Sequence, residues 1–389
     1  MKTETSIRLG LFLTHGVSLR RWEQLGLLDR EITPYRELAR TNQVDVSIIT
    51  YGDKRDISYK DRLAPIKILP LFADHTPKFT ILKFCHAFVG LWRLRHHLRG
   101  CDIFKSNQML GSHLALCAQF FFGGKFMLRT GYEFLDFSIK GQSHLLKQAL
   151  AFLLSWLAYK NADMIVVASQ NDKQFATRTF PTLHNRHFEI QPNWIDVDKF
   201  KPVVNSTIKK RDFVFVGRLE HQKNLEALID AAVLADVELD IIGEGSQEKK
   251  LRNQIKTNNS DNPKIRILSP IPNQDLPKYF AHYRGFILPS RFEGNPKTLL
   301  EAMSCAMPVI GADAPGISGL INHNENGMLC AGNTDDLAKA MLELLGNESQ
   351  ARRWGKAARL KIKQRNSLQS FLVQEMIRYK QLSQTKHSD

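Results

Sequence analysis

Residues 286–313 read FILPSRFEGNPKTLLEAMSCAMPVIGAD and contain two apolar runs on either side of a helix-length segment. The first run ends near Pro289, and Pro308-Val309-Ile310 begins the second. Between them, Asn295 is a favourable helix N-cap and Pro296 suits the first helical position. Strand, helix and strand in direct succession predict a βαβ unit with parallel strands.

The same alternation extends in both directions along the chain. Short apolar or β-branched runs predict strands in the C-terminal half at 213–216, 239–242, 265–268, 286–288, 309–310 and 328–330. Similar runs in the N-terminal half lie at 7–14, 44–50, 66–69, 103–105, 126–129 and 164–168. Helix-length segments separate the runs, so the sequence predicts an α/β fold with two doubly wound parallel sheets.

The chain of 389 residues has the length of two average domains. Pro192-Asn193-Trp194 and Lys201-Pro202 interrupt the pattern, and residues 205–211 are polar and basic. We therefore expect an N-terminal domain at 1–197 and a C-terminal domain at 198–365. Residues 366–389 should form a C-terminal helix that crosses back to the N-terminal domain, and a polar tail.

The composition is that of a globular protein with acidic partners. Hydrophobic residues make up 43% of the chain, charged residues 24%, and the net charge is +15. This excess of positive charge favours a nucleotide, nucleic acid, an anionic membrane surface or an acidic polymer. Five scattered cysteines without a CxxC pair favour reduced thiols in a cytoplasmic compartment over a zinc site or disulfides.

Membrane contact is an open alternative at residues 78–99, KFTILKFCHAFVGLWRLRHHLR. A basic amphipathic helix of this kind either lies on an anionic membrane or packs on the first sheet with a charged outer edge. The longest apolar stretch, 149–159, is well short of the roughly 20 residues that span a bilayer. The first apolar run predicts a strand and not a signal peptide. Nucleic-acid binding is disfavoured because no recognition motif is present.

The turn after the strand at 213–216 carries cations where a phosphate would bind. Gly217 allows close approach to the backbone, and Arg218 and Lys223 follow near the start of a helix. Free N–H groups and two positive side chains suit a diphosphate. The alternative is that both are surface cations in a solvated loop.

Two further turns carry candidate ligand groups. Gly243 and Gly245 follow a strand but lack the third glycine of the dinucleotide fingerprint, so they fit either nucleotide contact or a tight turn. Glu293 and Glu301 lie in a loop and on the helix after it, where carboxylates can accept hydrogen bonds from sugar and ribose hydroxyls. A solvated helix position is the alternative for Glu301.

Together these motifs resemble the family 4 retaining glycosyltransferases of the GT-B fold. The resemblance is strongest over residues 205–335, where the two glutamates stand as in the family's EX7E motif. The other matching strings, in order, are Gly217-Arg218 with Lys223, Gly243-Glu244-Gly245, Gly294-Asn295-Pro296, Leu300-Glu301-Ala302-Met303, Pro308-Val309-Ile310, Pro315-Gly316-Ile317 and Asn326-Gly327.

The resemblance implies two Rossmann-like domains whose sheets face a central cleft, with the acceptor in the first domain and the nucleotide sugar in the second. It implies that Arg218 and Lys223 bind the donor diphosphate and that Glu301 binds the ribose. Glu293 would contact the transferred sugar, so Arg218, Lys223 and Glu293 are the catalytic candidates. The remaining donor-side candidates are Gly16, Gly217, Gly243, Gly245, Gly294, Asn295, Pro296, Lys297 and Thr298.

The first domain departs from the family pattern. The family often has histidines where Lys105 and Asn107 stand, and a histidine where Thr130 stands. Arg129, Thr130 and Glu133 are acceptor-side candidates by position, with structural roles as the alternative. His113 is interpreted as a packing residue. In the second domain, Gly319 replaces a glutamate that is common in the family.

The resemblance also implies a metal-independent enzyme with no cofactor. It predicts that a sugar moves from a nucleotide diphosphate sugar to a glycan or lipid-linked acceptor with retention of configuration. Asp196-Val197-Asp198 spells a DxD, but it lies in a segment that resembles the family's inter-domain string, so we do not interpret it as a metal site. The alternatives are a nucleotide-sugar epimerase and a non-catalytic nucleotide-sugar-binding subunit.

Overall fold

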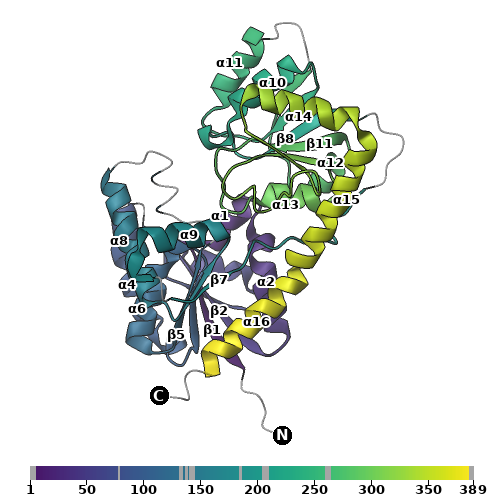
Figure 1. Ribbon diagram of the computed structural model, residues 1–389. Coiled ribbons are helices and arrows are strands. Elements are labelled where there is room, and N and C mark those ends of the chain that lie inside the picture. Colours follow the sequence, from purple (N-terminus) through teal and green to yellow (C-terminus); the bar gives the residue numbers. More distant parts are fainter. Residues whose placement is uncertain are drawn as a thin grey trace. The chain divides into compact units, whose positions relative to one another are not determined.

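A computed structural model describes residues 6–77, 79–130, 135, 139, 145–183, 186–203, 210–258 and 264–384. The chain divides into two units: residues 1–191 with 371–389, and residues 192–370. Each unit is built on its own parallel sheet (Figure 1).

The described part of the first unit holds a seven-stranded parallel sheet in the order β3-β2-β1-β4-β5-β6-β7. The predicted runs of the N-terminal half correspond to β1 through β6. The sequence did not predict β7, because its three residues, Phe-Glu-Ile, show too little pattern to be recognised. The strands are β1 (Ile7–Phe12), β2 (Val44–Thr50), β3 (Lys67–Pro70), β4 (Ile103–Ser106), β5 (Lys125–Thr130), β6 (Met164–Val167) and β7 (Phe188–Ile190).

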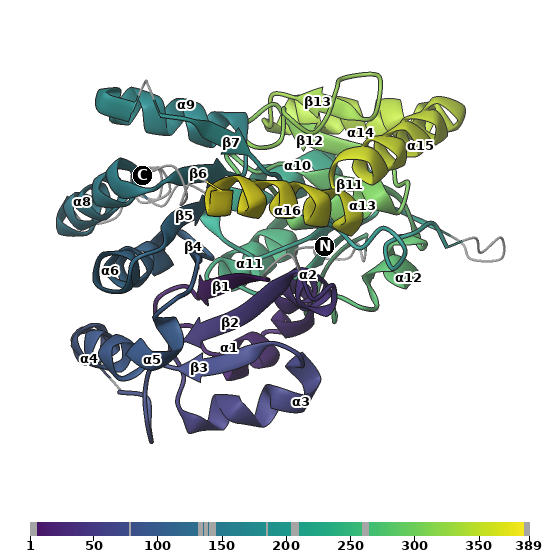
Figure 2. The ribbon, with the colours of Figure 1, turned by 90° about the horizontal axis from the view of Figure 1, so that it is seen from below.

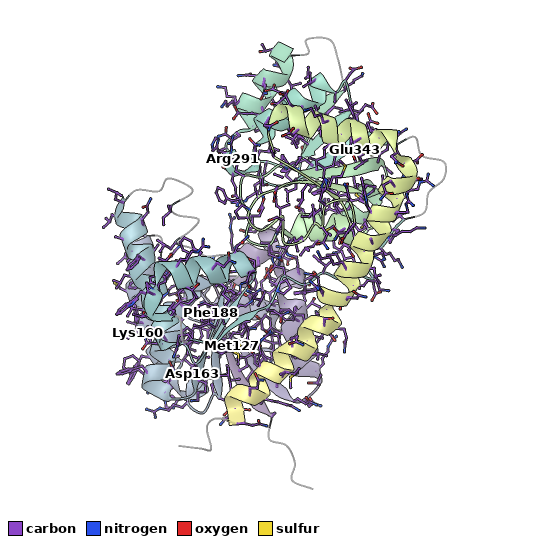
Figure 3. All side chains as sticks on the ribbon, viewed as in Figure 1. Met127, Lys160, Asp163, Phe188, Arg291 and Glu343 are labelled. Atoms are coloured by element: carbon purple, nitrogen blue, oxygen red, sulfur yellow. The ribbon has the colours of Figure 1, made fainter. Side chains whose placement is uncertain are left out.

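Helices cover both faces of this sheet (Figure 2). Met127 of β5 and Phe188 of β7 belong to the two separate apolar cores that result (Figure 3). One face packs on α1 (Leu19–Gln24), α2 (Leu28–Arg40) and the part of α16 (Leu368–Gln384) that belongs to this unit. The other packs on α4 (Thr80–Arg93), α6 (Ser112–Phe122), α8 (Leu145–Asn161) and α9 (Gln170–Thr179). Two short helices are α3 (Lys60–Leu63) and α5 (Arg95–Leu98).

The described part of the second unit holds a six-stranded parallel sheet in the order β10-β9-β8-β11-β12-β13. Its strands all correspond to predicted runs. They are β8 (Arg211–Val216), β9 (Leu239–Ile242), β10 (Ile265–Leu268), β11 (Tyr283–Leu288), β12 (Val309–Ala312) and β13 (Met328–Cys330). The helices are α10 (Leu225–Leu234), α11 (Glu248–Asn258), α12 (Leu276–Phe280), α13 (Lys297–Ser304), α14 (Thr334–Gly346) and α15 (Glu348–Arg365).

The predicted fold class, two Rossmann-like domains with parallel sheets, is confirmed. That the two sheets face a central cleft stays a prediction. Of the helices that the structure describes, none is both long enough and apolar enough to cross a bilayer.

A buried ionic network attaches α16 to the first sheet. Glu375 and Tyr379 lie one helical turn apart and both bond the amine of Lys105 on β4; the Tyr379 hydroxyl lies 3.2 Å from Nζ. Lys105 and Glu375 are completely buried. Burial lowers the pKa of Lys105 to about 8, although Glu375 opposes this shift. On the same helix, Arg378 pairs with Glu189 of β7. Lys105 therefore holds the C-terminal helix and does not reach the ligand edge of the sheet.

We expect Glu375→Ala to lower the free energy of unfolding by about 3–5 kcal/mol, because it leaves the Lys105 charge buried without its partner. Lys105→Met combined with Glu375→Leu should recover most of that loss, since it removes both charges. Urea denaturation followed by fluorescence measures both variants.

The matched control is Glu348→Ala, which removes an exposed partner of Arg352 on α15. It should change stability by less than about 1 kcal/mol, as exposed ion pairs do. Equal stability losses in Glu375→Ala and Glu348→Ala would contradict the structural role of the buried network.

Candidate nucleotide-sugar site

The site candidates of the second unit gather at the carboxyl edge of its sheet. β8 lies between β9 and β11 in the sheet. From β8, the strands continue through β9 to β10 on one side and through β11 and β12 to β13 on the other. Such a switch point leaves a crevice where open α/β sheets bind ligands. Gly217, Gly243 and Pro289 follow directly on β8, β9 and β11.

Lys223 and Glu293 form an ion pair at this edge. Nζ of Lys223 lies 2.5 Å from Oε1 of Glu293, and the two side chains are 11% and 8% exposed. Gln222 supports the loop of Glu293 with two hydrogen bonds. Its side-chain amide donates to the backbone carbonyl of Phe292 at 2.6 Å, and its backbone carbonyl accepts from the backbone amide of Arg291. The sequence predicted both charges as ligand groups but not their pairing.

Arg218 lies on the same turn with its side chain exposed. No ion pair involves it among the described residues. Its charge helps lower the pKa of Glu220, although the larger cause is the hydrogen bond that Glu220 accepts from Ser246. The guanidinium is therefore accessible to an anionic ligand, as the phosphate interpretation requires.

Glycines allow the site loops to approach each other. A Cβ on Gly243 would lie 1.9 Å from the carbonyl oxygen of Gly217, and one on Gly245 would lie 2.4 Å from that of Leu219. Both glycines thus have a packing role between the turns after β8 and β9. Whether they also contact a nucleotide stays a prediction.

The loop of Glu293 rests on the turn after β12. The Glu293 amide donates to the carbonyl of Pro315 at 2.8 Å. Gly316 has a φ of +81°, and a Cβ there would lie 2.1 Å from the Glu293 carbonyl oxygen. Gly319, three residues further on, has open space around its Cβ position. The turn therefore sets the position of Glu293 through Gly316 and not through Gly319.

Glu301 lies on α13 and is 1% exposed, which contradicts the solvated alternative. Its Oε1 accepts a hydrogen bond of 2.8 Å from Asn273, on the segment after β10. Asn273 was missed by the sequence analysis, because a single asparagine in a polar loop gives no signal. The carboxylate is thus oriented toward the same edge as the Lys223–Glu293 pair.

The start of α13 differs from the prediction. The helix begins at Lys297 with Pro296 as its N-cap, so the expectation of an Asn295 cap was wrong by one residue. Asn295 instead holds Asn193: its side-chain oxygen and its carbonyl each accept a hydrogen bond of 2.8 Å from Asn193. Gly294 is buried in the same loop, and Thr298 lies half-buried in the first turn.

The candidates of the first unit are less uniform. Gly16, with a φ of +76°, lies exposed in the loop after β1. Arg129 and Thr130 are buried at the end of β5, and burial lowers the pKa of Arg129 while the Glu375 charge opposes that shift. Their acceptor role stays a prediction. Glu133 lies outside the described residues.

Asp196 of the DxD string caps its own turn. Its Oδ1 accepts from the amides of Asp198 and Lys199 at 3.2 and 3.0 Å. This Asx-type turn explains the aspartate by local structure.

The sequence analysis also missed a ring cluster at the carboxyl edge of the first sheet. His15 follows β1, Tyr51 follows β2, and His113 lies in the first turn of α6, the helix after β4. His113 was interpreted as packing, and His15 was not singled out. The position of His15 directly after the first strand was the signal that could have found it.

Residues 196–361 match the family described as Glycosyl transferases group 1. This match lies within the second unit and covers less than half of the chain.

Two curated relatives and one solved structure illustrate the similarity. An uncharacterised glycosyltransferase of Methanocaldococcus jannaschii is 32% identical over 40% of this chain and 41% of its own length. The Escherichia coli UDP-Gal:alpha-D-GlcNAc-diphosphoundecaprenol alpha-1,3-galactosyltransferase is 24% identical over 75% of this chain and 78% of its own. Anabaena HepE in complex with UDP superposes with a TM-score of 0.75 at 18% identity, over 96% of this chain and 100% of its own.

The match to the first of these relatives thus spans about two fifths of that protein's length. The likeness to HepE shows the fold, which is the GT-B fold of two Rossmann-like domains.

We expect Gly316→Ala to destabilise the second unit by at least about 1 kcal/mol, because alanine disfavours the left-handed region and its Cβ would displace the Glu293 backbone. Gly319→Ala is the control and should be nearly neutral. Urea midpoints of the two variants measure the difference. Equal midpoints would mean that the turn after β12 does not hold the Glu293 loop.

Proposed function

We propose that this chain is a retaining glycosyltransferase. It moves a sugar from a nucleotide diphosphate sugar to an acceptor hydroxyl, in the synthesis of a cell-surface polysaccharide, glycolipid or related glycoconjugate. The observation that carries the proposal is the Lys223–Glu293 ion pair, held at the switch point of a domain that matches the glycosyltransferase family.

The pair is arranged for a ligand that bears both phosphate and hydroxyl groups. Lys223 would turn from Glu293 toward the donor diphosphate, and Arg218 would approach from the exposed side of the turn. Glu293 would then accept hydrogen bonds from the hydroxyls of the transferred sugar. Before the donor binds, the ion pair therefore already holds a cation for the diphosphate beside a carboxylate for the sugar hydroxyls.

Catalysis follows from where negative charge develops. As the sugar–phosphate bond breaks, the leaving diphosphate gains charge, which Arg218, Lys223 and the N–H groups at the start of α13 would stabilise. These groups supply the positive charge that a metal ion supplies in other transferases, so we propose a metal-independent reaction. The acceptor hydroxyl attacks the anomeric carbon, and its proton leaves with the diphosphate.

Glu301 would bind the ribose of the donor. Its carboxylate can accept from both ribose hydroxyls while Asn273 fixes its orientation. Lys297 and Thr298 of the first turn of α13 would lie near the diphosphate or the sugar. HepE was solved with UDP, so UDP is the first nucleotide to test here.

Two other functions fit parts of the same site. A nucleotide-sugar epimerase would bind the same donor, and product analysis would find an isomerised nucleotide sugar in place of a glycosylated acceptor. A non-catalytic binding subunit would hold the donor without turnover, which its failure to hydrolyse or transfer would reveal. The set of Arg218, Lys223, Glu293 and Glu301 favours the transferase.

We expect Arg218→Ala and Lys223→Ala each to reduce turnover about 100- to 1000-fold, the usual loss when one charge-stabilising donor is removed. Donor hydrolysis or transfer, measured with purified protein, checks this. Arg218→Ala is the cleaner variant because Arg218 is exposed, whereas Lys223→Ala also leaves Glu293 buried without its partner.

Arg352→Ala serves as the control, since this exposed arginine lies on α15 and pairs with Glu348. It should keep full turnover and an unchanged thermal unfolding curve. Unchanged turnover in both site variants would end the phosphate assignment.

We further propose that the enzyme works in the cytoplasm at an anionic membrane surface. The helices α4, α6 and α8 lie side by side on one face of the first sheet (Figure 2). We call this surface the α4–α6–α8 face. Its exposed apolar side chains include Leu82, Val89, Trp92, Phe120, Phe121, Leu145, Leu146, Leu150, Phe152, Leu153 and Leu157.

The positive charge of this face favours an anionic partner. The sequences of α4, α5, α6 and α8 contain no Asp or Glu. Their cations include Lys83, Arg93 and Arg95, together with Lys160 at the end of α8 (Figure 3). Apolar surface with only positive charge fits an anionic bilayer, which attracts basic residues and takes up apolar side chains. Such a position would suit a lipid-linked acceptor.

We expect the combined substitutions Phe120→Ser, Leu146→Ser and Leu150→Ser to reduce binding to phosphatidylglycerol vesicles at least about tenfold. Each removed side chain is worth about 1.5–3 kcal/mol when fully buried. Sedimentation with vesicles measures this, and phosphatidylcholine vesicles should bind wild type more weakly.

Leu342→Ser with Leu360→Ser is the control, because these leucines are also exposed, at 52% and 58%, on helices of the second unit. It should bind vesicles as wild type does. Two results would contradict the membrane proposal: wild-type protein binds neither kind of vesicle, or it forms a dimer that covers the α4–α6–α8 face.

A further inference from the structure

Six rings from five segments meet at the carboxyl edge of the first sheet. His15 lies in the loop after β1, Tyr51 and Phe72 follow β2 and β3, and His113 lies in the first turn of α6. Phe84 and Phe88 of α4 complete the group. The ring centroids of His15 and Tyr51 are 4.8 Å apart, and those of Phe84 and His113 are 5.2 Å apart in a stacked arrangement. We call these residues the histidine–aromatic cluster.

One hydrogen bond orders the cluster. The hydroxyl of buried Tyr51 lies 2.9 Å from Nε2 of His113. His15 packs edge-on to Tyr51 and tilted to His113, at a centroid distance of 5.7 Å. Within the described part of the chain, Nδ1 of His15 is buried without a hydrogen-bond partner. His15 therefore keeps unused hydrogen-bonding capacity in an otherwise packed site.

Burial favours the neutral form of both imidazoles. Burial lowers the pKa of His113 to about 4, and the neighbouring His15 adds to this shift. Burial and the charge of Lys83 lower the pKa of His15 below its ordinary value. A neutral imidazole carries one donor and one acceptor nitrogen, so it can bond hydroxyl groups without attracting a phosphate.

The exposure of the cluster is graded from inside to outside. Tyr51 is 1% exposed, His15 and His113 are half-buried, and the ring of Phe84 is 44% exposed. An open phenyl face beside neutral polar nitrogens is typical of sites for ligands that have an apolar face and polar edges. A sugar ring has both, since its C–H groups form an apolar face and its hydroxyls lie at the rim.

The location of the histidine–aromatic cluster also favours a ligand site. Loops at the carboxyl ends of parallel strands are where such sheets bind ligands, and the cluster draws on the ends of β1, β2, β3 and β4. Packing alone would not require two histidines here, because a buried imidazole nitrogen without a partner is less favourable than an apolar ring of similar size.

We propose that the histidine–aromatic cluster binds a sugar ring of the acceptor, with the apolar face of the ring on Phe84 and a hydroxyl bonded to His15. This inference rests on the proposed transferase function and assigns its acceptor an uncharged pyranose at this position. Tyr51 and His113 are positioning residues, since their hydrogen bond fixes the ring on which Phe84 stacks.

The test uses the full chain and n-octyl β-glycosides of glucose, galactose and N-acetylglucosamine as probes. Proton–nitrogen spectra of the imidazoles would be recorded with and without each glycoside. At least one glycoside should shift the signals of His15 and His113, and no shift with any of the three would overturn the proposal. His15→Ala and Phe84→Ala should each weaken binding of that glycoside about tenfold, which corresponds to one net hydrogen bond or ring contact.

His187→Ala is the matched control, because that histidine lies beside β7 with its side chain 80% exposed. It should bind the glycoside as wild type does. Equal affinity in wild type, His15→Ala and Phe84→Ala would overturn the proposal. If His15→Ala or Phe84→Ala also loses its folded spectrum, the binding loss is tested with Phe84→Leu instead. This variant keeps an apolar side chain but removes the flat aromatic face, so it should bind the glycoside more weakly than wild type does.

UDP binding, measured by thermal shift on the same samples, separates this inference from the proposed function. It should be unchanged in Phe84→Ala and His187→Ala, because the donor candidates other than Gly16 lie in the second unit. Wild type that binds no UDP and no other nucleotide would sink the transferase proposal. If wild type binds UDP but no glycoside shifts the signals of His15 and His113, only the acceptor-site proposal is contradicted.

Discussion

The Lys223–Glu293 ion pair is the contact on which the rest of the proposed donor site depends. It connects the turn after β8 with the loop after β11, two segments far apart in sequence that meet because their strands are neighbours in the sheet. A buried pair is costly to form, since both charges leave water. Its retention at a ligand edge is consistent with a use beyond stability: a diphosphate can take the cation while a sugar hydroxyl takes the carboxylate.

The surrounding structure serves to hold this pair in place. Gly316 lets the turn after β12 contact the Glu293 backbone, and Gln222 bonds the same loop from the other side. Asn273 orients Glu301 on the adjoining helix. Positioning of this kind lets a site stabilise developing charge without reorganisation, which is usually the larger part of electrostatic catalysis.

Much of the fold could be predicted from the sequence because buried parallel strands are continuous apolar runs. Twelve of the thirteen strands in the described sheets correspond to such runs, and the exception is the three-residue β7. Arg218, Lys223, Glu293 and Glu301 could be proposed for the same reason, since each follows a recognisable strand or begins a recognisable helix.

What could not be predicted depends on contacts between distant segments. Only the structure shows that Lys105 meets Glu375, 270 positions later. The pairing of His15, Tyr51 and His113 likewise depends on the order β2-β1-β4 in the sheet, which no local pattern specifies. The start of α13 was misplaced because Asn295 bonds Asn193 and does not cap the helix.

The most direct measurement is a crystal structure of the chain in complex with UDP. We expect the diphosphate within hydrogen-bonding distance of Arg218 and Lys223, the ribose hydroxyls on Glu301, and Glu293 released from Lys223. UDP bound at another place, with the Lys223–Glu293 pair intact and Arg218 free of phosphate, would contradict it.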